Sequence, residues 1–444
     1  MVGLEAGNSV ILGDGRAGKT NDGPAMKYRS RVLGLLASLC VLTYADRVCI
    51  SVAGPRLQAD LGLSPVQWGM VTGAFALAYM VFEIPAGYLA DRFGARAMVT
   101  RIVLWWSAFT CLTGLVSTLG SLVVVRFLFG MGEAGAYPTA STSVFRWFPP
   151  LERGRAFGVI FLATQLGGAL APLLIVPLQM HFGWRASFYV FGAAGMAWTL
   201  VWWRAYRNRP AEAAGITAAE IAAIGGGDEL AHDFPWRALT ASRHVWALMG
   251  SVCGYFYSYY FFLFWLPTYM LRDRGFSERE TQLSALPFVL AAATSLAGGF
   301  ARDAALRRWG QTRGPRFVCQ FGLTVSAASA AAAIVCPERH WALGFLALCY
   351  GSITFQQPAV LSACVDIGKR YAGAVVGCIN SAAALGGLLS SAAFGYLIQR
   401  WGNYDAVLGS MAGALLAGAA LWSLVDAARP LHAPGIGRAA AVRA

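Results

Sequence analysis

The sequence predicts an all-α membrane protein with twelve transmembrane helices in two pseudo-symmetric bundles of six. Three observations lead to this fold class. Of the 444 residues, 57% are hydrophobic and only 13% are charged, whereas about 25% of the residues of a soluble protein are charged. Twelve spans of about 20 apolar residues need roughly 240 positions and leave about 200 for loops, tails and one connector. The third observation is a similarity between the two halves of the chain.

Long apolar runs follow one another along the chain, each bounded by Arg, Pro, Gly or Asp. They lie at about 33–54, 67–89, 98–118, 121–141, 156–178, 187–206, 245–271, 282–301, 316–336, 341–364, 372–398 and 405–426. We therefore expect a cytoplasmic tail over 1–30, a six-helix bundle over 31–206, a cytoplasmic linker over 207–242, a second bundle over 243–426 and a cytoplasmic tail over 427–444.

The positions of lysine and arginine predict which side of the membrane each loop faces. With the N-terminus inside the cell, the cytoplasmic tails and loops hold 26 of the 35 Lys and Arg residues, and the opposite side holds seven. Basic loops stay in the cytoplasm, so both termini are expected there. The net charge of +13 then reflects topology, and we expect no nucleic-acid partner. The polar segment Met1–Met26 has no signal-peptide pattern.

The two halves share a weak internal repeat. A shift of 219 positions places Gly158 on Gly377, Gly167 and Gly168 on Gly386 and Gly387, and Gly183 on Gly402, and a shift of 212 places Asp91 on Asp303. Such repeats are typical of transporters built from two bundles around a site near the membrane midplane. Chance matches among 51 glycines are the alternative.

Motifs for catalysis, cofactors and metals are missing from the sequence. The nine cysteines fall singly inside or beside apolar runs, without a CxxC pair, so we interpret them as packing residues rather than as a disulfide or metal framework. No Ser-His-Asp set, HExxH, Walker loop or dinucleotide fingerprint occurs. We therefore expect no enzyme, no catalytic residue, no metal and no cofactor.

Charged residues inside the spans are the first candidates for a functional site. Asp46 and Arg47 lie in the first span, and Arg126 and Glu133 lie in the fourth. A charge at bilayer depth costs at least about 2.5–3.5 kcal/mol, so such residues normally face a bundle interior or an aqueous cavity. Arg126 and Glu133 are two helical turns apart on one face, while Tyr44 shares a face with Arg47 and Asp46 is turned from it by about 100°.

These residue types can support anion capture coupled to proton binding. Arg47 can bind a carboxylate through two parallel hydrogen bonds. Burial favours the protonated form of Glu133 and Asp46, and a nearby arginine opposes protonation. An anion bound to Arg47 would weaken that opposition, so substrate and proton would load together. A static salt bridge between the first and fourth helices is the alternative.

The loop after the second span carries the sequence GYLADRFGAR. Asp91, Arg92 and Arg96 in this loop, and Asp303 in a second copy, can form a latch that breaks when the bundles rock. A basic cytoplasmic loop without a mechanical role is the alternative. Glu83 is interpreted as a structural partner of Arg92 or Arg96.

These motifs carry a family resemblance. The loop resembles the signature loop of the major facilitator superfamily, which implies its two-bundle fold over residues 31 to 426. Three motifs narrow the resemblance to the anion:cation symporter family: Tyr44-x-Asp46-Arg47-x-x-Ile50-Ser51, Gly130-Met131-Gly132-Glu133-Ala134, and Trp147-Phe148-Pro149-x-x-Glu152-Arg153-Gly154. Members of that family import organic anions such as galactonate, glucarate, hexuronates and phthalate.

The resemblance also implies roles for individual residues. Arg47 matches the arginine that binds the substrate carboxylate, Asp46 and Glu133 match proton carriers, and Arg126 matches a residue that links protonation to gating. Cys49 departs from the Asn of many members, which weakens any transfer of substrate identity.

Further polar and aromatic residues are expected to complete the pocket. The candidates for substrate binding beside Arg47 are Tyr44, Tyr79, Gln165, Asn380 and Ser381. Tyr255, Tyr259 and Phe262 form one aromatic stripe on the seventh span, with helix packing as the alternative role. The segment Gln356-Gln357-Pro358 interrupts the tenth span and is a candidate gate.

The sequence thus favours a proton-coupled importer of a small organic carboxylate in a bacterial inner membrane, acting as a monomer. A sugar acid is the favoured substrate. The alternatives are an aromatic acid of the phthalate type, an anion exchanger or uniporter, and an exporter of hydrophobic drugs, which would not need an arginine in its cavity.

Overall fold

The computed structural model describes residues 28–213, 216–217, 220–221, 224 and 236–431, and this part of the chain contains helices but no strand. The first half forms α1 (Tyr28–Asp60), α2 (Pro65–Thr113), α3 (Leu119–Glu133), α4 (Ala136–Trp147), α5 (Pro150–Phe182), α6 (Trp184–Ala205) and η1 (Pro210–Glu212). The second half forms α8 (Trp236–Ala241), α9 (Arg243–Phe264), α10 (Leu266–Arg272), η2 (Arg279–Ala285), α11 (Leu286–Val335), α12 (Arg339–Gly368), η3 (Lys369–Tyr371), α13 (Ala372–Trp401), α14 (Asp405–Leu421) and η4 (Trp422–Leu424).

The helices coincide with the twelve predicted spans once the breaks within them are taken into account. Both α2 and α11 cover two predicted spans, and each bends at a glycine with positive φ: Gly94 at 79° and Gly310 at 75°. Residues that have a Cβ atom rarely adopt a positive φ, whereas glycine adopts it readily. The fourth span is divided into α3 and α4 at Gly135, which has a φ of 91°, and the seventh into α9 and α10 just before Pro267. By length and composition alone, eight helical stretches in the described part of the chain can cross a membrane.

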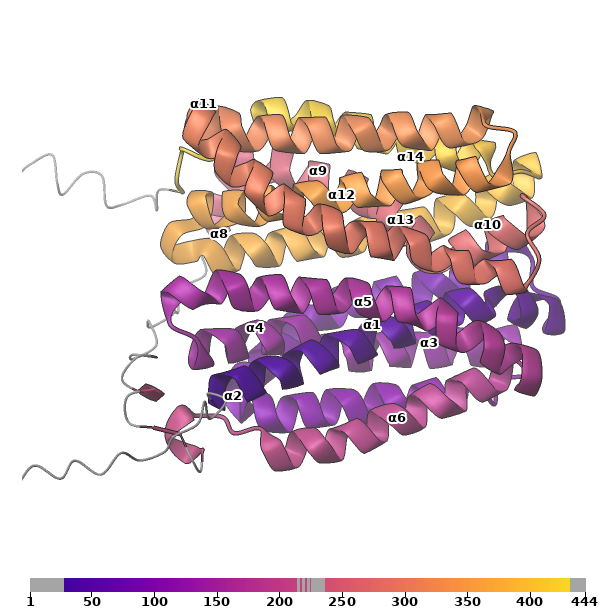
Figure 1. Cartoon of the computed structure of the whole chain (residues 1–444), viewed down its shortest axis with the longest axis horizontal. Helices are drawn as coiled ribbons and strands as arrows, with labels where there is room; N and C mark the ends of the chain where they lie inside the picture. Colours follow the sequence, from indigo (N-terminus) through magenta and orange to yellow (C-terminus); the bar gives the residue numbers. More distant parts are fainter. Residues whose placement is uncertain (1–27, 214–215, 218–219, 222–223, 225–235, 432–444) are drawn as a thin grey trace, which may run out of the picture.

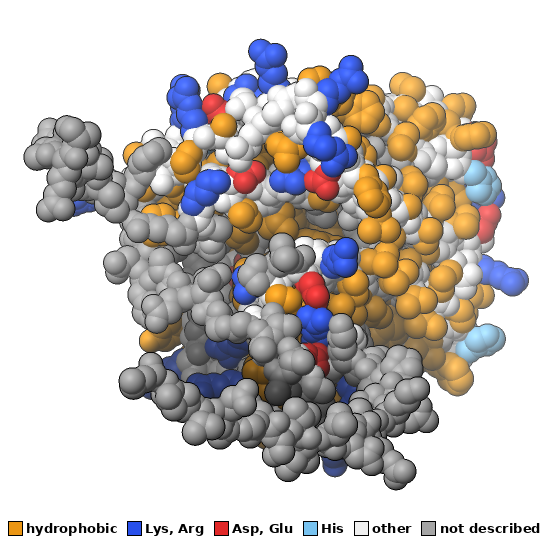
Figure 2. Space-filling model, turned by 60° about the vertical axis from the view of Figure 1, so that its left-hand side comes forward, with side chains coloured by type: hydrophobic (Ala, Val, Ile, Leu, Met, Phe, Trp, Pro, Cys, Tyr) orange, Lys and Arg blue, Asp and Glu red, His pale blue; other side chains and the backbone are white. Residues whose placement is uncertain are grey.

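The two halves of the chain form two layers that run side by side (Figure 1). Helices α1 to α6 make one layer and α9 to α14 the other, and α2 packs on α13 and α5 on α11 across the boundary. Small residues permit this approach, because a Cβ atom at Gly395 would lie 2.6 Å from the Pro65 carbonyl oxygen. We call the end where α1 begins the terminal end and the end where α1 finishes the far end. Basic side chains gather at the terminal end, and hydrophobic side chains cover the flank (Figure 2).

Contacts between the halves close the far end. Arg56 at the end of α1 forms an ion pair with Glu278, which precedes η2, with 2.6 Å between Arg56 Nη2 and Glu278 Oε2. Gln179 of α5 donates to Glu278 Oε1 at 3.2 Å. Nearby, Trp68 of α2 donates through Nε1 to the Phe264 carbonyl at 3.2 Å. These contacts join α1, α2 and α5 of one half to α9 and the α10–η2 loop of the other.

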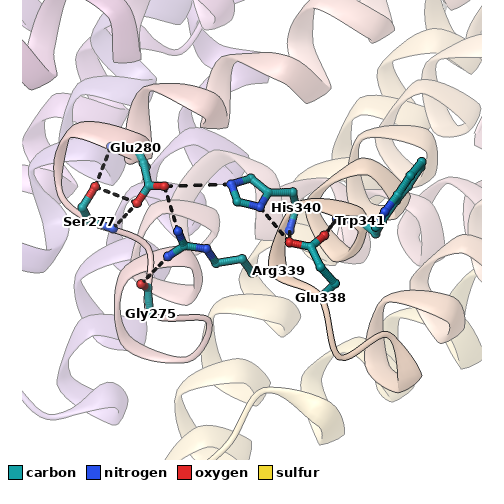
Figure 3. A network of polar contacts seen from close by, with 7 residues as sticks. All are labelled: Gly275, Ser277, Glu280, Glu338, Arg339, His340 and Trp341. Carbon is teal, nitrogen blue, oxygen red and sulfur yellow. Dashed lines mark hydrogen bonds and ion pairs between the residues drawn. The ribbon is translucent and has the colours of Figure 1, made fainter.

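The loop that carries Glu278 is itself anchored to the start of α12 (Figure 3). Arg339 binds Glu280 Oε1 at 3.0 Å and donates to the Gly275 carbonyl at 2.8 Å. Glu338 accepts hydrogen bonds from the backbone amides of residues 340 and 341, and these bonds lower its pKa to about 2. Glu338 is therefore ionised throughout the physiological pH range, and this N-cap of α12 persists. The anchor holds Glu278 in reach of Arg56.

Replacing Arg56 with alanine is expected to open the far end more often. The pair is only about two-thirds buried, with side chains 33% and 30% exposed, so we expect a loss of about 1 kcal/mol, or a roughly fivefold shift in population. The measurement is the distance distribution between spin labels placed at the far ends of α1 and η2. Arg185→Ala is the matched control, because it breaks an ion pair with Asp60 at the same end but within one half. An equal shift in both variants would contradict a role for Arg56 in closure.

Candidate functional site

A cavity of about 190 Å³ lies between the two layers, on the terminal side of the closed far end. Seven helices line it: α1, α2, α4, α5, α9, α12 and α13. Its polar lining residues are Thr43, Tyr44, Arg47, Tyr79, Glu83, Tyr137, Thr164, Gln165, Tyr255, Tyr259, Tyr260, Gln357 and Asn380. Both halves therefore contribute to one compartment near the middle of the molecule.

Arg47 is the basic residue of this cavity. It pairs through Nε with Glu133 Oε1, and its side chain is only 11% exposed. Its Cζ lies 4.8 Å from the centre of the Tyr79 ring and 5.3 Å from those of Tyr44 and Phe75. The rings stabilise the cation by their π faces and hold the planar guanidinium in one orientation. The Nη groups remain outside the Glu133 pair, so a carboxylate can be bound by the forked end of the side chain.

Glu133 reaches Arg47 because α3 ends at this residue. The left-handed conformation of Gly135 breaks the helix immediately afterwards. Close packing of α3 on α2 needs Gly130, since a Cβ atom there would lie 2.6 Å from the Phe75 carbonyl oxygen. The local sequence thus places a carboxyl group at a helix break, directly beside the cavity arginine.

Asp46 and Arg126 lie behind the cavity wall. Asp46, Arg126 and Glu133 are at most 3% exposed. The Asp46 carboxyl is buried near Thr110 and Trp106 of the second segment of α2, and the charges of Arg126 and Glu133 act on it. Neither Asp46 nor Arg126 lines the cavity. The structure therefore joins the four predicted charges in one buried cluster, of which Arg47 faces the cavity.

Four of the other five candidate substrate-binding residues line the cavity, namely Tyr44, Tyr79, Gln165 and Asn380. Two of them form hydrogen bonds with the second half of the chain. The Tyr44 hydroxyl accepts a hydrogen bond of 3.3 Å from the Tyr259 hydroxyl, and Gln165 Oε1 accepts one of 3.4 Å from the Tyr350 hydroxyl. Ser381 lies outside the lining, and its hydroxyl donates to the Gly377 carbonyl of its own helix at 3.1 Å.

Glu83 has a different partner from the one we inferred. Its Oε1 accepts a hydrogen bond of 3.2 Å from Asn380 Nδ2 on α13. The interpretation as a partner of Arg92 or Arg96 is wrong, because Arg96 donates to the Trp203 carbonyl and Arg92 lies exposed over the Phe93 ring. Residues 83 and 380 are far apart in sequence, and nothing local signals their contact.

The aromatic stripe on α9 has two roles. Tyr255 and Tyr259 line the cavity, whereas Phe262 packs on Tyr350 with ring centres 4.7 Å apart. Of the two glutamines before Pro358, Gln357 lines the cavity and Gln356 is fully buried. Sequence reasoning missed Thr43, Tyr137, Thr164 and Tyr260 as lining residues, since isolated hydroxyl groups in apolar helices carry no distinctive pattern.

Comparison with known proteins identifies the family. The sequence profile of the Major Facilitator Superfamily matches residues 36–391. The chain belongs to the Major Facilitator Superfamily. It is 34% identical over 406 residues to the probable sulfoacetate transporter SauU of Cupriavidus necator, covering 90% of this chain and 94% of that protein. It is 30% identical over 416 residues to the D-galactonate transporter of Escherichia coli, covering 88% and 94%.

A solved structure shows the same superfamily fold. A bacterial homologue of the human lysosomal transporter Spinster, inward-facing and unoccupied, matches with a TM-score of 0.67 and 22% identity, over 90% of this chain and 95% of that one. The predicted fold class and the superfamily resemblance are confirmed. This superfamily member is a multi-pass membrane protein, and its family and relatives are transporters rather than enzymes.

The superfamily signature loop stays within its own half in the described residues. Besides its bond to Trp203, Arg96 donates through its backbone amide to the Asn208 side chain at 2.9 Å. Asp303 pairs with the adjacent Arg302 at 2.7 Å. The side chain of Asp91 lies outside the described part of the structure. The latch that we predicted from this loop stays a prediction.

Proposed function

We propose that this protein is a proton-coupled importer of a small organic carboxylate that works by alternating access. One observation carries the proposal: Arg47, buried and held between aromatic rings in a cavity between the halves, is paired with the carboxyl group of Glu133. The side chain that would bind the anion and the group that would bind the proton are then in direct contact. Relatives whose names give galactonate, hexuronate and sulfoacetate as cargo support an organic anion as the substrate class.

The coupling follows from competition for Arg47. A substrate carboxylate that binds the guanidinium weakens its hold on Glu133, and a buried carboxyl without a full counter-charge takes up a proton more readily. When the proton leaves, Glu133 competes with the substrate again and favours its release. The Asp46 and Arg126 side chains behind the wall would tune this exchange. Loading would occur with the far end open to the outside, and release with the terminal end open to the cytoplasm.

The cavity lining favours a hydroxylated acid. Amide groups of Gln165, Gln357 and Asn380 and several hydroxyl groups face the cavity, and these groups can bind sugar hydroxyls as donors and acceptors. The tyrosine rings of α9 could also hold an aromatic acid. We propose a sugar acid as the substrate and keep a phthalate-type acid as the second candidate.

Transport by purified protein tests the proposal directly. Proteoliposomes would be offered labelled sugar acids and aromatic acids, with and without an inward proton gradient. We expect gradient-driven accumulation of one class of acid. If the labelled acid only equilibrates across the membrane, with or without the proton gradient, the protein is an exchanger or uniporter, which needs Arg47 but no titrating carboxyl. Uptake of no acid at all would contradict the anion site itself.

A further inference from the structure

Glu83 is a carboxyl group of the cavity that the proposed coupling does not use. It lies on α2, one helical turn beyond Tyr79, and its side chain is 7% exposed. Among the described residues no lysine or arginine lies within ion-pair distance of it, and its hydrogen-bond partner is the Asn380 amide of the other half. A buried carboxyl group without a basic partner interacts directly with any ligand that reaches this part of the cavity.

The cavity therefore has a basic end and an acidic end. Tyr79 contacts Arg47, and one helical turn separates Tyr79 from Glu83, or about 6 Å along α2 toward the terminal end. A ligand whose carboxylate binds the fork of Arg47 and whose chain extends along α2 reaches Glu83 and Asn380. The charge at that end of the ligand decides whether the contact is attractive.

We propose that Glu83 sets the charge selectivity of this transporter, admitting hydroxylated monoanions and rejecting dianions of the same length. The inference rests on the proposed function, because it assumes that a carboxylate occupies Arg47. A hydroxyl group can donate to Glu83 and accept from Asn380 Nδ2, which replaces the bond the two residues now make to each other. A second carboxylate only accepts hydrogen bonds. Beside the ionised form of Glu83, whose side chain is buried, it meets a like charge that water screens little.

Asn380 alone would not give this selectivity. Its amide group offers both a donor and an acceptor, so it can bind either a hydroxyl or a carboxylate. The discrimination comes from the negative charge beside it. Glu83→Gln removes that charge with little change in shape, and Glu83→Asp keeps it.

Binding of D-gluconate and D-glucarate to the purified full-length protein tests the assignment. The two acids share one six-carbon hydroxylated skeleton, and a second carboxylate in glucarate replaces the terminal hydroxymethyl group of gluconate. We expect the wild type to bind gluconate at least tenfold more tightly than glucarate. In Glu83→Gln the ratio should fall at least tenfold, because the amide can donate to the second carboxylate. Glu83→Asp should keep the wild-type preference, and so should the control Glu212→Gln, which neutralises an exposed carboxyl on η1.

The outcomes separate this inference from the function on which it rests. Equal binding of both acids by the wild type, or an unchanged ratio in Glu83→Gln, would overturn the role of Glu83 and leave the anion site at Arg47 intact. If the wild type binds neither acid nor any other organic anion, the proposed function fails and this inference fails with it. Because the wild-type ratio is itself a test, the assignment can be contradicted even if Glu83→Gln does not fold.

Discussion

Transport of the preferred carboxylate is expected to fall at least about 100-fold when Arg47 is replaced by alanine. Truncating one partner of a buried, hydrogen-bonded charge pair at a binding contact costs about 2–5 kcal/mol or more, and a loss of about 3 kcal/mol within this range already corresponds to more than 100-fold. The change removes the forked donor that would bind the substrate and leaves Glu133 without its counter-charge. Arg47→Lys keeps the charge but loses the fork and the stacking on Tyr79, so we expect a smaller loss, of about 10- to 100-fold.

The measurement is initial uptake into proteoliposomes, with equal amounts of reconstituted protein for each variant. Arg185→Ala is the control, because Arg185 forms a half-exposed ion pair with Asp60 far from the cavity. A second measurement, binding of the same acid without a gradient, separates a lost site from a lost conformational cycle. Full uptake by Arg47→Ala would exclude an anion site at this arginine and favour an exporter of hydrophobic compounds.

Helical periodicity explains why part of this site could be predicted from the sequence. Charged residues are costly in lipid, so their presence in the first and fourth spans indicated an interior cluster. The turn of about 100° between consecutive residues separated Arg47 from Asp46, and in the structure Arg47 lines the cavity while Asp46 lies behind it. The apolar runs located the helices for the same physical reason, since only helices satisfy backbone groups within a single membrane segment.

Contacts between distant segments were not predictable in this way. The hydrogen bond between Glu83 and Asn380 and the ion pair between Arg56 and Glu278 depend on how the two bundles dock, and no local pattern encodes docking. The position of Glu83 near a basic loop suggested the wrong partner for the same reason. Ser381 shows a related limit. Consecutive residues of a helix point in directions about 100° apart, so Asn380 lines the cavity while its neighbour Ser381 does not.

Replacing Glu133 with glutamine is expected to abolish accumulation of substrate against its concentration gradient. Exchange of substrate across the membrane should persist in this variant. The glutamine carbonyl can still accept from Arg47 Nε, so the packing around the pair persists. The amide cannot take up and release a proton, so the proton gradient no longer acts on Arg47 through this residue. At equilibrium one coupled proton gives about tenfold accumulation per pH unit, and in the variant the inside-to-outside ratio should fall to about one.

Counterflow identifies uncoupling as the cause of that loss. Vesicles loaded with unlabelled substrate should still take up labelled substrate through Glu133→Gln, because exchange needs Arg47 but no net proton movement. Glu152→Gln, which neutralises a carboxyl paired with Arg29 at the terminal end, should accumulate substrate like the wild type. Asp46 is a buried member of the same cluster, behind the cavity wall, so accumulation that survives in Glu133→Gln but is lost in Asp46→Asn would place the proton site at Asp46. Accumulation that survives in both variants would leave the cluster as a static ion-pair network, and the transporter would then run as an exchanger or uniporter.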